Sequence, residues 1–175
     1  MVMVKLGVAG VGGRMGIMIL KEIENRSDTV IASGLVRSGS SLVGSDLGTI
    51  ASRECVGVAA TDNAKQCFAD ADVVIDFSLP EAIEEIAGAA IDAKKPWVVG
   101  TTGLDERQEA ILRTASHEVP VVFASNMSLG VNLLFALVEQ VAGSLDDNYD
   151  IEILDFHHNN KVDAPSGTAI SLGEA

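Results

Sequence analysis

Residues 2–16 read VMVKLGVAGVGGRMG, and this stretch decides the fold. Its first part, Val2 to Ala9, is the apolar run of a short buried strand, and its second part, Gly10 to Gly16, is a turn rich in glycine. Residues 17–23 continue with apolar side chains at helical spacing. Such a turn brings the backbone close to a pyrophosphate and presents the N–H groups of a helix N-terminus to it. The stretch therefore predicts a dinucleotide-binding unit of strand, turn and helix.

The spacing of these glycines departs from the usual dinucleotide pattern. Gly10, Gly13 and Gly16 form Gly-x-x-Gly-x-x-Gly, whereas the common fingerprint is Gly-x-Gly-x-x-Gly. The last glycine therefore lies one position late. A turn that only packs would also be rich in glycine, but the place of this one, at the first strand–helix junction, favours a dinucleotide.

The first 128 residues alternate short apolar strands with helices. We expect further strands at residues 29–36, 56–60, 71–77, 96–99 and 119–124. We expect helices at residues 63–69, from the turn after residue 78 to residue 93, and at residues 105–115. Ser78-Leu79-Pro80-Glu81 has the form of a capping box, and residues 37–48, rich in Ser and Gly, predict a loop. The alternation predicts an α/β fold with a Rossmann-like, doubly wound parallel sheet.

The pattern of apolar and polar residues changes after Ser128. Residues 129–141 predict a helix with a stripe of apolar side chains at Leu134, Leu137 and Val141. Residues 150–157 alternate in polarity, which is typical of a strand in a second, antiparallel sheet. We therefore predict a dinucleotide-binding domain at residues 1–128 and the first part of an α+β substrate-binding and oligomerisation domain at residues 129–175.

The end of the second strand bears on the choice of cofactor. An NAD-specific site usually carries Asp or Glu there to bind the ribose hydroxyls, but this chain has Val36-Arg37-Ser38. Arg37, with Arg14 as a second cation, suits the 2′-phosphate of NADPH. The sequence thus favours NADPH over NADH. If Arg37 is only a solvated loop residue, both cofactors are accepted.

Composition excludes several classes of function. The 175 residues include 25 acidic and 12 basic side chains, for a net charge of -13, which argues against a nucleic-acid partner but not against a small anion. No window of about 18 uncharged apolar residues exists, so no membrane span is expected. Cys55 and Cys67 lack the spacing of a zinc site or a disulfide framework. We expect a cytoplasmic protein with reduced thiols and no metal.

Residues 157–168 read HHNNKVDAPSGT and gather the groups that a small dianionic substrate requires. His157 and His158 are adjacent, so on an extended strand their side chains point to opposite faces. Lys161 adds a cation. Residues 165–168 read as the start of a helix with Ser166 or Thr168 as its N-cap, and such an N-terminus binds a carboxylate or phosphate. Zinc is not expected, because the two histidines lack a third ligand at suitable spacing.

Together these segments resemble the dihydrodipicolinate reductase family, also called 4-hydroxy-tetrahydrodipicolinate reductases. The matching segments follow the family's order and are residues 10–16, 44–46, 76–77, 100–103, 126–132 and 157–169. The resemblance implies NAD(P)H-dependent reduction of 4-hydroxy-tetrahydrodipicolinate to tetrahydrodipicolinate in diaminopimelate and lysine biosynthesis. It implies that His157 is the proton donor and that Lys161 is both the second catalytic residue and a cation for the substrate. It implies that a substrate carboxylate is held by His158, Ser166, Gly167 and Thr168, and that Thr102 contacts the substrate near the nicotinamide.

Three loops at the carboxyl ends of the predicted strands complete the expected cofactor site, since ligands of such sheets bind at that edge. These loops are residues 77–78, 100–102 and 125–127. The expected cofactor-binding residues are Gly10, Gly12, Gly13, Arg14, Met15, Gly16, Arg37, Phe77, Gly100, Thr102, Ser125 and Met127.

The chain departs from the family's pattern in two ways. Val36 stands where the family has an acidic residue that binds the ribose, which supports the preference for NADPH. Family members also continue for about a hundred further residues, a domain's worth. In the family these residues complete the antiparallel sheet and form a homotetramer. The alternative to an active reductase is therefore an inactive, NADPH-binding fragment of that family. A different two-domain dehydrogenase is not suggested by residues 157–161.

Overall fold

The computed structural model describes residues 3–146, 148–157, 159 and 164–175. The chain divides into two compact units, residues 1–123 and residues 124–175, and each is described by itself. No helix of the described residues is long and apolar enough to cross a membrane.

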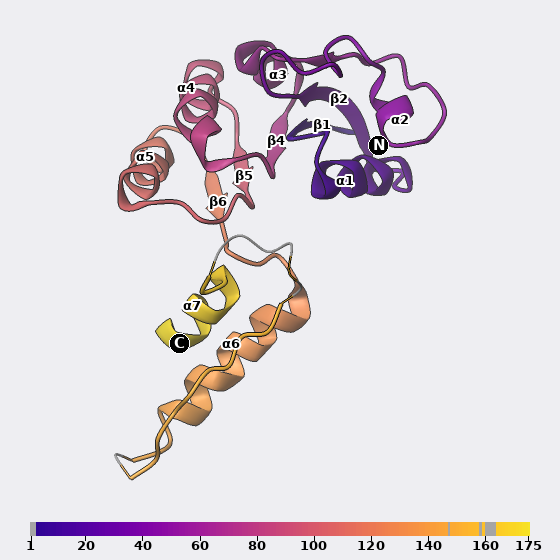
Figure 1. The fold of residues 1–175 in the computed structure, drawn as a ribbon. Coiled ribbons are helices and arrows are strands. Elements are labelled where there is room, and N and C mark those ends of the chain that lie inside the picture. The colour runs from indigo at the N-terminus through magenta and orange to yellow at the C-terminus, as the bar shows by residue number, and fades with distance from the viewer. Residues whose placement is uncertain (1–2, 147, 158, 160–163) are drawn as a thin grey trace. The chain divides into compact units, whose positions relative to one another are not determined.

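The first unit is built on a six-stranded parallel sheet (Figure 1). Its strands are β1 (Val4–Ala9), β2 (Thr29–Leu35), β3 (Ala60–Thr61), β4 (Val73–Asp76), β5 (Trp97–Val99) and β6 (Val121–Phe123). They lie in the order β3-β2-β1-β4-β5-β6, and every pairing is parallel. This is the strand order of a dinucleotide-binding sheet, in which the order reverses between β1 and β4. The predicted doubly wound fold is confirmed.

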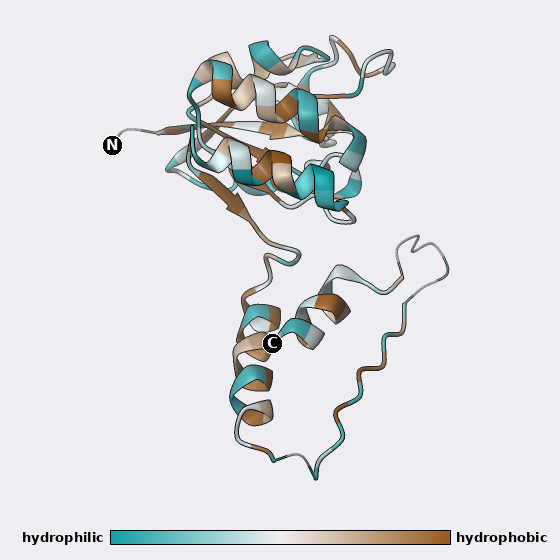
Figure 2. Ribbon diagram, turned by 90° about the vertical axis from the view of Figure 1, so that its left-hand side faces the viewer, coloured by the Kyte–Doolittle hydropathy of each residue, from teal (hydrophilic) through white to brown (hydrophobic). Residues whose placement is uncertain are grey.

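Helices connect these strands and bury the two faces of the sheet. They are α1 (Arg14–Glu24), α2 (Leu47–Ile50), α3 (Ala64–Asp70), α4 (Ile83–Ala93) and α5 (Glu106–Ser116), with a 3₁₀ turn, η1, at Pro80–Ala82. One buried apolar cluster includes Phe68, Ile83 and Trp97, and a second includes Leu20 and Leu47. Figure 2 shows the hydrophobic strands enclosed between helices of mixed colour. The burial of two separate clusters follows from helices that cover both faces of a parallel sheet.

Two predicted helix starts need correction. The first helix begins at Arg14 rather than near residue 17, with Gly13 as its N-cap. The capping box predicted for Ser78 and Glu81 is absent, because the η1 turn begins after Leu79 without a side-chain cap. The N–H of Ser78 instead donates to Asp76 Oδ1 at 2.8 Å, which turns the chain before the helix begins. A capping box does form at α5, where Asp105 and Gln108 bond each other's backbone N–H groups.

Asp46 orders the end of the loop that follows β2. Its Oδ1 accepts hydrogen bonds from the backbone N–H groups of Gly48 (2.9 Å), Thr49 (3.2 Å) and Val56 (3.1 Å), and its Oδ2 accepts one from Gly57 (2.7 Å). A Cβ on Gly48 would overlap the carbonyl oxygen of Glu54. These contacts give a structural reason for Asp46, the last residue of the segment at residues 44–46.

The Asp46 carboxylate should make the fold sensitive to acid. Burial alone would raise its pKa, but the hydrogen bonds, foremost that from Val56, outweigh this effect and hold the pKa at about 2. The folded value lies below the usual value of about 3.9, so the carboxylate stabilises the fold above about pH 4, and this contribution is lost as the pH falls towards 2. We expect an Asp46→Asn chain to be less stable at neutral pH and to lose less stability on acidification. Urea unfolding at several pH values measures the free energy of unfolding of each chain. If this free energy falls equally with pH in the parent and in Asp46→Asn, the prediction is contradicted.

The second unit contains α6 (Leu129–Ala142) and α7 (Gly167–Glu174). The predicted helix at residues 129–141 is confirmed, but none of its side chains is buried, and Leu134 and Leu137 are 46% and 49% exposed. The strand predicted at residues 150–157 is wrong. A strand requires a neighbour for its backbone N–H and C=O groups, and the described residues supply none beside this segment.

Candidate functional site

The glycine turn has a shape that only glycine permits at two positions. Gly10 has a φ of +84°, and a Cβ there would lie 2.5 Å from the carbonyl oxygen of Phe77. A Cβ on Gly16 would overlap the carbonyl oxygen of Gly10 and lie 2.6 Å from Val11 Cα. Gly16 therefore lets the first turn of α1 rest directly on the loop. This contact gives a physical reason for the late third glycine.

The turn forms one wall of a cavity of about 740 Å³. Ligand pockets are typically about 300–1,000 Å³, so the cavity can hold a large part of a dinucleotide. The lining residues come from the glycine turn, from the end of β2, from the loops after β2, β3 and β4, from the η1 turn and from the start of α4. They are Gly10, Gly12, Gly13, Leu35, Val36, Arg37, Ser38, Ser40, Ser41, Leu42, Asp62, Phe77, Ser78, Leu79, Glu81, Ala82, Glu85 and Ile86.

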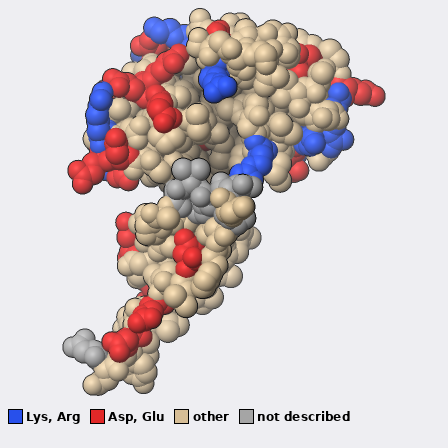
Figure 3. Space-filling model, viewed as in Figure 1, with Lys and Arg blue, Asp and Glu red and all other residues tan. Residues whose placement is uncertain are grey.

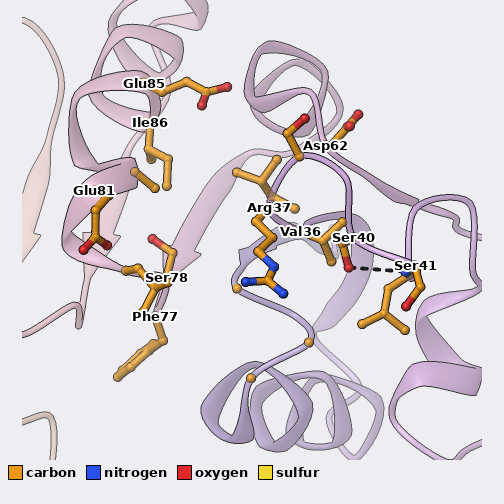
Figure 4. Close-up of a pocket in the computed structure, with 18 residues that line it drawn as sticks. Val36, Arg37, Ser40, Ser41, Asp62, Phe77, Ser78, Glu81, Glu85 and Ile86 are labelled. Carbon is orange, nitrogen blue, oxygen red and sulfur yellow. Dashed lines mark hydrogen bonds between the residues drawn. The ribbon is translucent and has the colours of Figure 1, made fainter. Parts of the chain in front are cut away.

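The charges around this cavity are mixed. Figure 4 shows Arg37 with Asp62 on one side, and Phe77, Ser78, Glu81 and Glu85 on the other. Acidic side chains also gather over α4 and α5 on the face seen in Figure 3. Arg37 is the one cation among the described residues that line the cavity. An anionic group bound here therefore depends on Arg37 and on backbone N–H groups.

The structure brings together five of the residues predicted for the cofactor. Gly10, Gly12, Gly13, Arg37 and Phe77 line the cavity. Arg14, Met15 and Gly16 lie in the first turn of α1, and Gly100 and Thr102 follow β5, all outside the lining. Gly100 packs on the ring of Phe77, where a Cβ would overlap the ring atoms. Ser125 and Met127 belong to the second unit, and His158 and Lys161 lie outside the described residues.

Sequence reasoning missed the role of Asp76, a buried carboxylate at the end of β4. Its Oδ1 accepts hydrogen bonds from Ser78 N (2.8 Å) and Thr101 Oγ1 (3.3 Å), and its Oδ2 accepts one from Trp97 Nε1 (3.2 Å). Burial raises the pKa of Asp76, and the contacts of Ser78, Trp97 and Thr101 oppose that shift. Asp76 thus links the loops that follow β4 and β5. The available signal was a carboxylate that ends an otherwise apolar strand.

Ser78 adds a polar group at the edge of the cavity. Its Oγ is buried and, among the described residues, has no hydrogen-bond partner of good geometry. Ser78 lines the cavity beside Phe77. Burial raises the pKa of Asp76, and the Ser78 side chain interacts with that carboxyl and opposes the rise, so the Ser78 hydroxyl is a polar group at the cavity edge that Asp76 partly satisfies.

In the second unit, one carboxylate links a predicted catalytic residue to a predicted binding residue. His157 Nδ1 lies 2.8 Å from Asp155 Oδ1, and Ser166 N donates to Asp155 Oδ2 at 3.0 Å. The sequence offered Ser166 or Thr168 as the N-cap of this helix, and the N-cap of α7 is Ser166. Its Oγ accepts a hydrogen bond from Ala169 N at 3.0 Å. Thr168 Oγ1 accepts from Asn126 Nδ2 at 3.2 Å. Asp155 was missed, although it lies two residues before His157.

Comparison with protein families agrees with the sheet order and the glycine turn. Residues 4–127 match the model of the dihydrodipicolinate reductase N-terminus, and residues 130–175 match that of the C-terminus. The chain belongs to the dihydrodipicolinate reductase family. The resemblance found in the sequence is thereby confirmed.

Relatives in this family include proteins named 4-hydroxy-tetrahydrodipicolinate reductase. One from Parvibaculum lavamentivorans is 47% identical over 173 residues, and one from Halorhodospira halophila is 45% identical over 170 residues. These alignments cover 98% and 97% of the chain but 64% of each relative, so the chain spans slightly less than two-thirds of their length.

Solved structures support the fold. A dipicolinate-bound dihydrodipicolinate reductase from Paenisporosarcina sp. TG-14 superposes with a TM-score of 0.72 at 23% sequence identity. The superposition covers 98% of this chain and 64% of that reductase. An aspartate semialdehyde dehydrogenase with NADP from Candida albicans superposes with a TM-score of 0.56 at 15% sequence identity. That superposition covers 79% of this chain and 47% of the dehydrogenase. At these identities the likeness shows a shared fold and no more.

Proposed function

We propose that the chain carries the cofactor site of an NADPH-dependent 4-hydroxy-tetrahydrodipicolinate reductase. The observation that carries this proposal is the cavity formed by the glycine turn at the carboxyl edge of the sheet, in a chain of this family. The backbone N–H groups of Gly12 and Arg14 lie at the N-terminus of α1, where negative charge is stabilised, while that of Gly13 donates to Gly10 O within the turn. They suit the pyrophosphate, with Arg14, Met15 and Gly16 in the same helical turn.

The choice of NADPH rests on Arg37. It follows the end of β2 and lines the cavity together with Ser38, Ser40 and Ser41, so a cation and three hydroxyl-bearing residues surround one corner. This set matches the needs of a 2′-phosphate, because a guanidinium binds phosphate through charge-assisted hydrogen bonds. NADH lacks that phosphate and is the weaker ligand in this proposal.

The nicotinamide half of the cofactor is proposed to lie near Phe77, Gly100 and Thr102. Phe77 lines the cavity and its ring packs on Gly100, so these residues form a continuous surface beyond the glycine turn. Ser78, whose Oγ is buried, lies beside it in the cavity lining. Ser125 and Met127, on the third loop, complete this set in the proposal.

The substrate is proposed to be a small cyclic dicarboxylate held by residues 157–168. Ser166, Gly167 and Thr168 form the N-terminus of α7, and His158 and Lys161 add positive or hydrogen-bonding groups. When bound, a dihydronicotinamide would supply the hydride that replaces the substrate's hydroxyl on carbon, and the departing hydroxyl would take up one proton to leave as water. His157 donates the proton that this departure needs, while Lys161 balances the substrate's negative charge.

In this proposal the two parts of the chain have different binding functions. Residues 1–128 bind the dinucleotide, and residues 129–175 contribute the substrate groups and part of an oligomerisation domain. The apolar side chains of α6, which are not buried within its own unit, are consistent with such a domain. Homotetramer formation by the full-length protein remains part of the proposal.

The deciding experiment measures turnover and binding with the same preparation. The chain is mixed with NADPH and freshly made 4-hydroxy-tetrahydrodipicolinate, and oxidation is followed at the nicotinamide absorbance band. We expect Lys161→Ala to reduce turnover by about 100-fold or more, the usual scale for a proton-transfer or charge-stabilising group. Lys65→Ala, which removes a surface ion pair with Asp92, should leave turnover unchanged.

Three outcomes separate the alternatives. Turnover that depends on Lys161 supports the reductase. NADPH binding without any turnover supports the inactive, cofactor-binding fragment. Absence of both binding and turnover in a folded chain would contradict the proposal itself.

A further inference from the structure

The second unit contains a carboxylate with two defined partners. Asp155 Oδ1 lies 2.8 Å from His157 Nδ1, and Asp155 Oδ2 accepts a hydrogen bond from Ser166 N at 3.0 Å. Both oxygens of one carboxylate are therefore engaged by groups that lie two and eleven residues further along the chain. One partner is the proposed proton donor, and the other is the N-cap of the helix proposed to bind the substrate.

The local backbone explains how Asp155 reaches His157. Side chains at positions i and i+2 of an extended segment point to the same side, so Asp155 and His157 share one side. The side chains of His157 and Asp155 are 39% and 27% exposed, so the pair is neither sealed in a core nor fully solvated. A substrate can reach the imidazole from solvent while the carboxylate holds it.

The contact also selects one form of the neutral imidazole. A carboxylate accepts hydrogen bonds, so a neutral ring bonded through Nδ1 must carry its hydrogen on Nδ1. Nε2 is then the nitrogen that binds a second proton and passes it to a ligand, so His157 donates from its doubly protonated form. Carboxylates fix both the tautomer and the orientation of a histidine in this way in catalytic and metal sites.

The second bond of Asp155 ties this histidine to α7. Ser166 is only 2% exposed, its N–H is held by Asp155, and its Oγ accepts from Ala169 N. The position of the helix N-terminus is thus coupled to that of the His157 ring. A substrate carboxylate at residues 166–168 and a proton donor at His157 then have a defined spacing.

We propose that Asp155 is a positioning residue for His157: it holds the Nδ1–H tautomer and fixes the ring relative to the N-terminus of α7. The inference rests on the proposed function only in taking His157 as the proton donor. The tautomer of His157 can be measured without turnover, so the two proposals can fail separately.

The test uses the full 175-residue chain labelled with ¹⁵N at histidine. The chain has three histidines, and a His157→Gln chain identifies the signals of His157. Spectra are recorded at increasing pH until the ring ¹⁵N shifts no longer change. The ¹⁵N shifts of the two ring nitrogens then report which of them carries the hydrogen.

We expect the Nδ1–H form for His157 in the parent chain and mainly the Nε2–H form, the usual preference of a free imidazole, in Asp155→Asn. Asp150→Asn, which removes an exposed carboxylate from the same segment, should leave the signals unchanged. In uniformly ¹⁵N-labelled chains, the backbone N–H signal of Ser166 should shift in Asp155→Asn but not in Asp150→Asn. Asp155→Glu should restore part of both effects. Circular dichroism of each variant establishes that it is folded.

An Nε2–H form in the parent chain, or an unchanged tautomer in a folded Asp155→Asn chain, would overturn the inference. If the parent chain shows turnover, Asp155→Asn should lower kcat by about 10–100-fold, the usual effect of removing such a supporting carboxylate, with less change in KM. A parent chain with no turnover would weaken the proposed function, while the tautomer measurement would still decide this inference.

Discussion

A Gly16→Ala chain should lose NADPH binding and much of its stability. The added Cβ would overlap the carbonyl oxygen of Gly10 and lie 2.6 Å from Val11 Cα, so either α1 or the turn must move. Both obstacles are backbone atoms, which cannot rotate away as a side chain can. Overpacking of this kind costs about 1–3 kcal/mol, a large share of the about 5–15 kcal/mol that stabilises a typical domain. Because the turn would lose its shape, we expect NADPH affinity to fall by about 100-fold or more, as binding needs the N–H groups in place.

Gly88→Ala provides the matched control. Gly88 lies within α4, and a Cβ there would have no atom within 4 Å. Alanine is favoured over glycine inside a helix, so this change should stabilise the chain by about 0.5–1 kcal/mol and leave NADPH binding unchanged. Urea unfolding followed by the fluorescence of Trp97, the chain's single and fully buried tryptophan, measures both variants. A Gly16→Ala chain as stable as Gly88→Ala, or one that binds NADPH as the parent does, would contradict this account of the turn.

The sequence predicted the sheet because each strand and helix carries its own local signal. The apolar runs that became β1, β2, β4, β5 and β6 lie between helices, and a parallel sheet is the arrangement that buries both faces of such strands. The start of α7 was predicted for the same reason, since an N-cap is a contact between residues three apart.

The errors arose where the outcome depends on partners distant in sequence. The Ser78–Glu81 pattern fits a capping box, but Asp76 takes the N–H of Ser78 and itself depends on Trp97 and Thr101. Such a buried network cannot be read from a window of four residues. At residues 150–157 the alternation of polarity indicates an extended backbone, whereas a strand also requires a neighbour.

The candidate site was predicted in its residue types better than in its arrangement. Arg37 and Phe77 lie 40 positions apart, yet the sheet places the ends of β2 and β4 on either side of β1, and both residues line one cavity. Their meeting follows from the strand order, which the sequence did not specify. Asp155 escaped notice because its role depends on Ser166, eleven residues further along the chain.

Arg37→Ala should convert a preference for NADPH into indifference or a preference for NADH. Arg37 is the one cation among the described lining residues, and Asp62, Glu81 and Glu85 line the same cavity. Without the guanidinium, a 2′-phosphate would meet hydroxyl groups and carboxylates only. Hydrogen bonds to charged groups contribute about 1.5–3 kcal/mol, so NADPH affinity should fall by about 10–100-fold. NADH carries a hydroxyl at that position, and its affinity should change by less than about 3-fold, within the range of a surface substitution.

The comparison of two cofactors on one variant separates charge recognition from damage to the fold. Titration calorimetry gives both dissociation constants for the parent, for Arg37→Ala and for a control, Arg26→Ala, which removes only an exposed ion pair with Asp28. Added salt should reduce the parent's preference for NADPH, since the contact lies at a cavity open to solvent and exposed charges are screened. An Arg37→Ala chain in which both affinities fall by the same factor would mean that Arg37 supports the loop rather than the phosphate. In that case the preference for NADPH would have to come from the backbone of residues 38–41, and a proline scan of that loop rather than a change of charge would be needed to alter it.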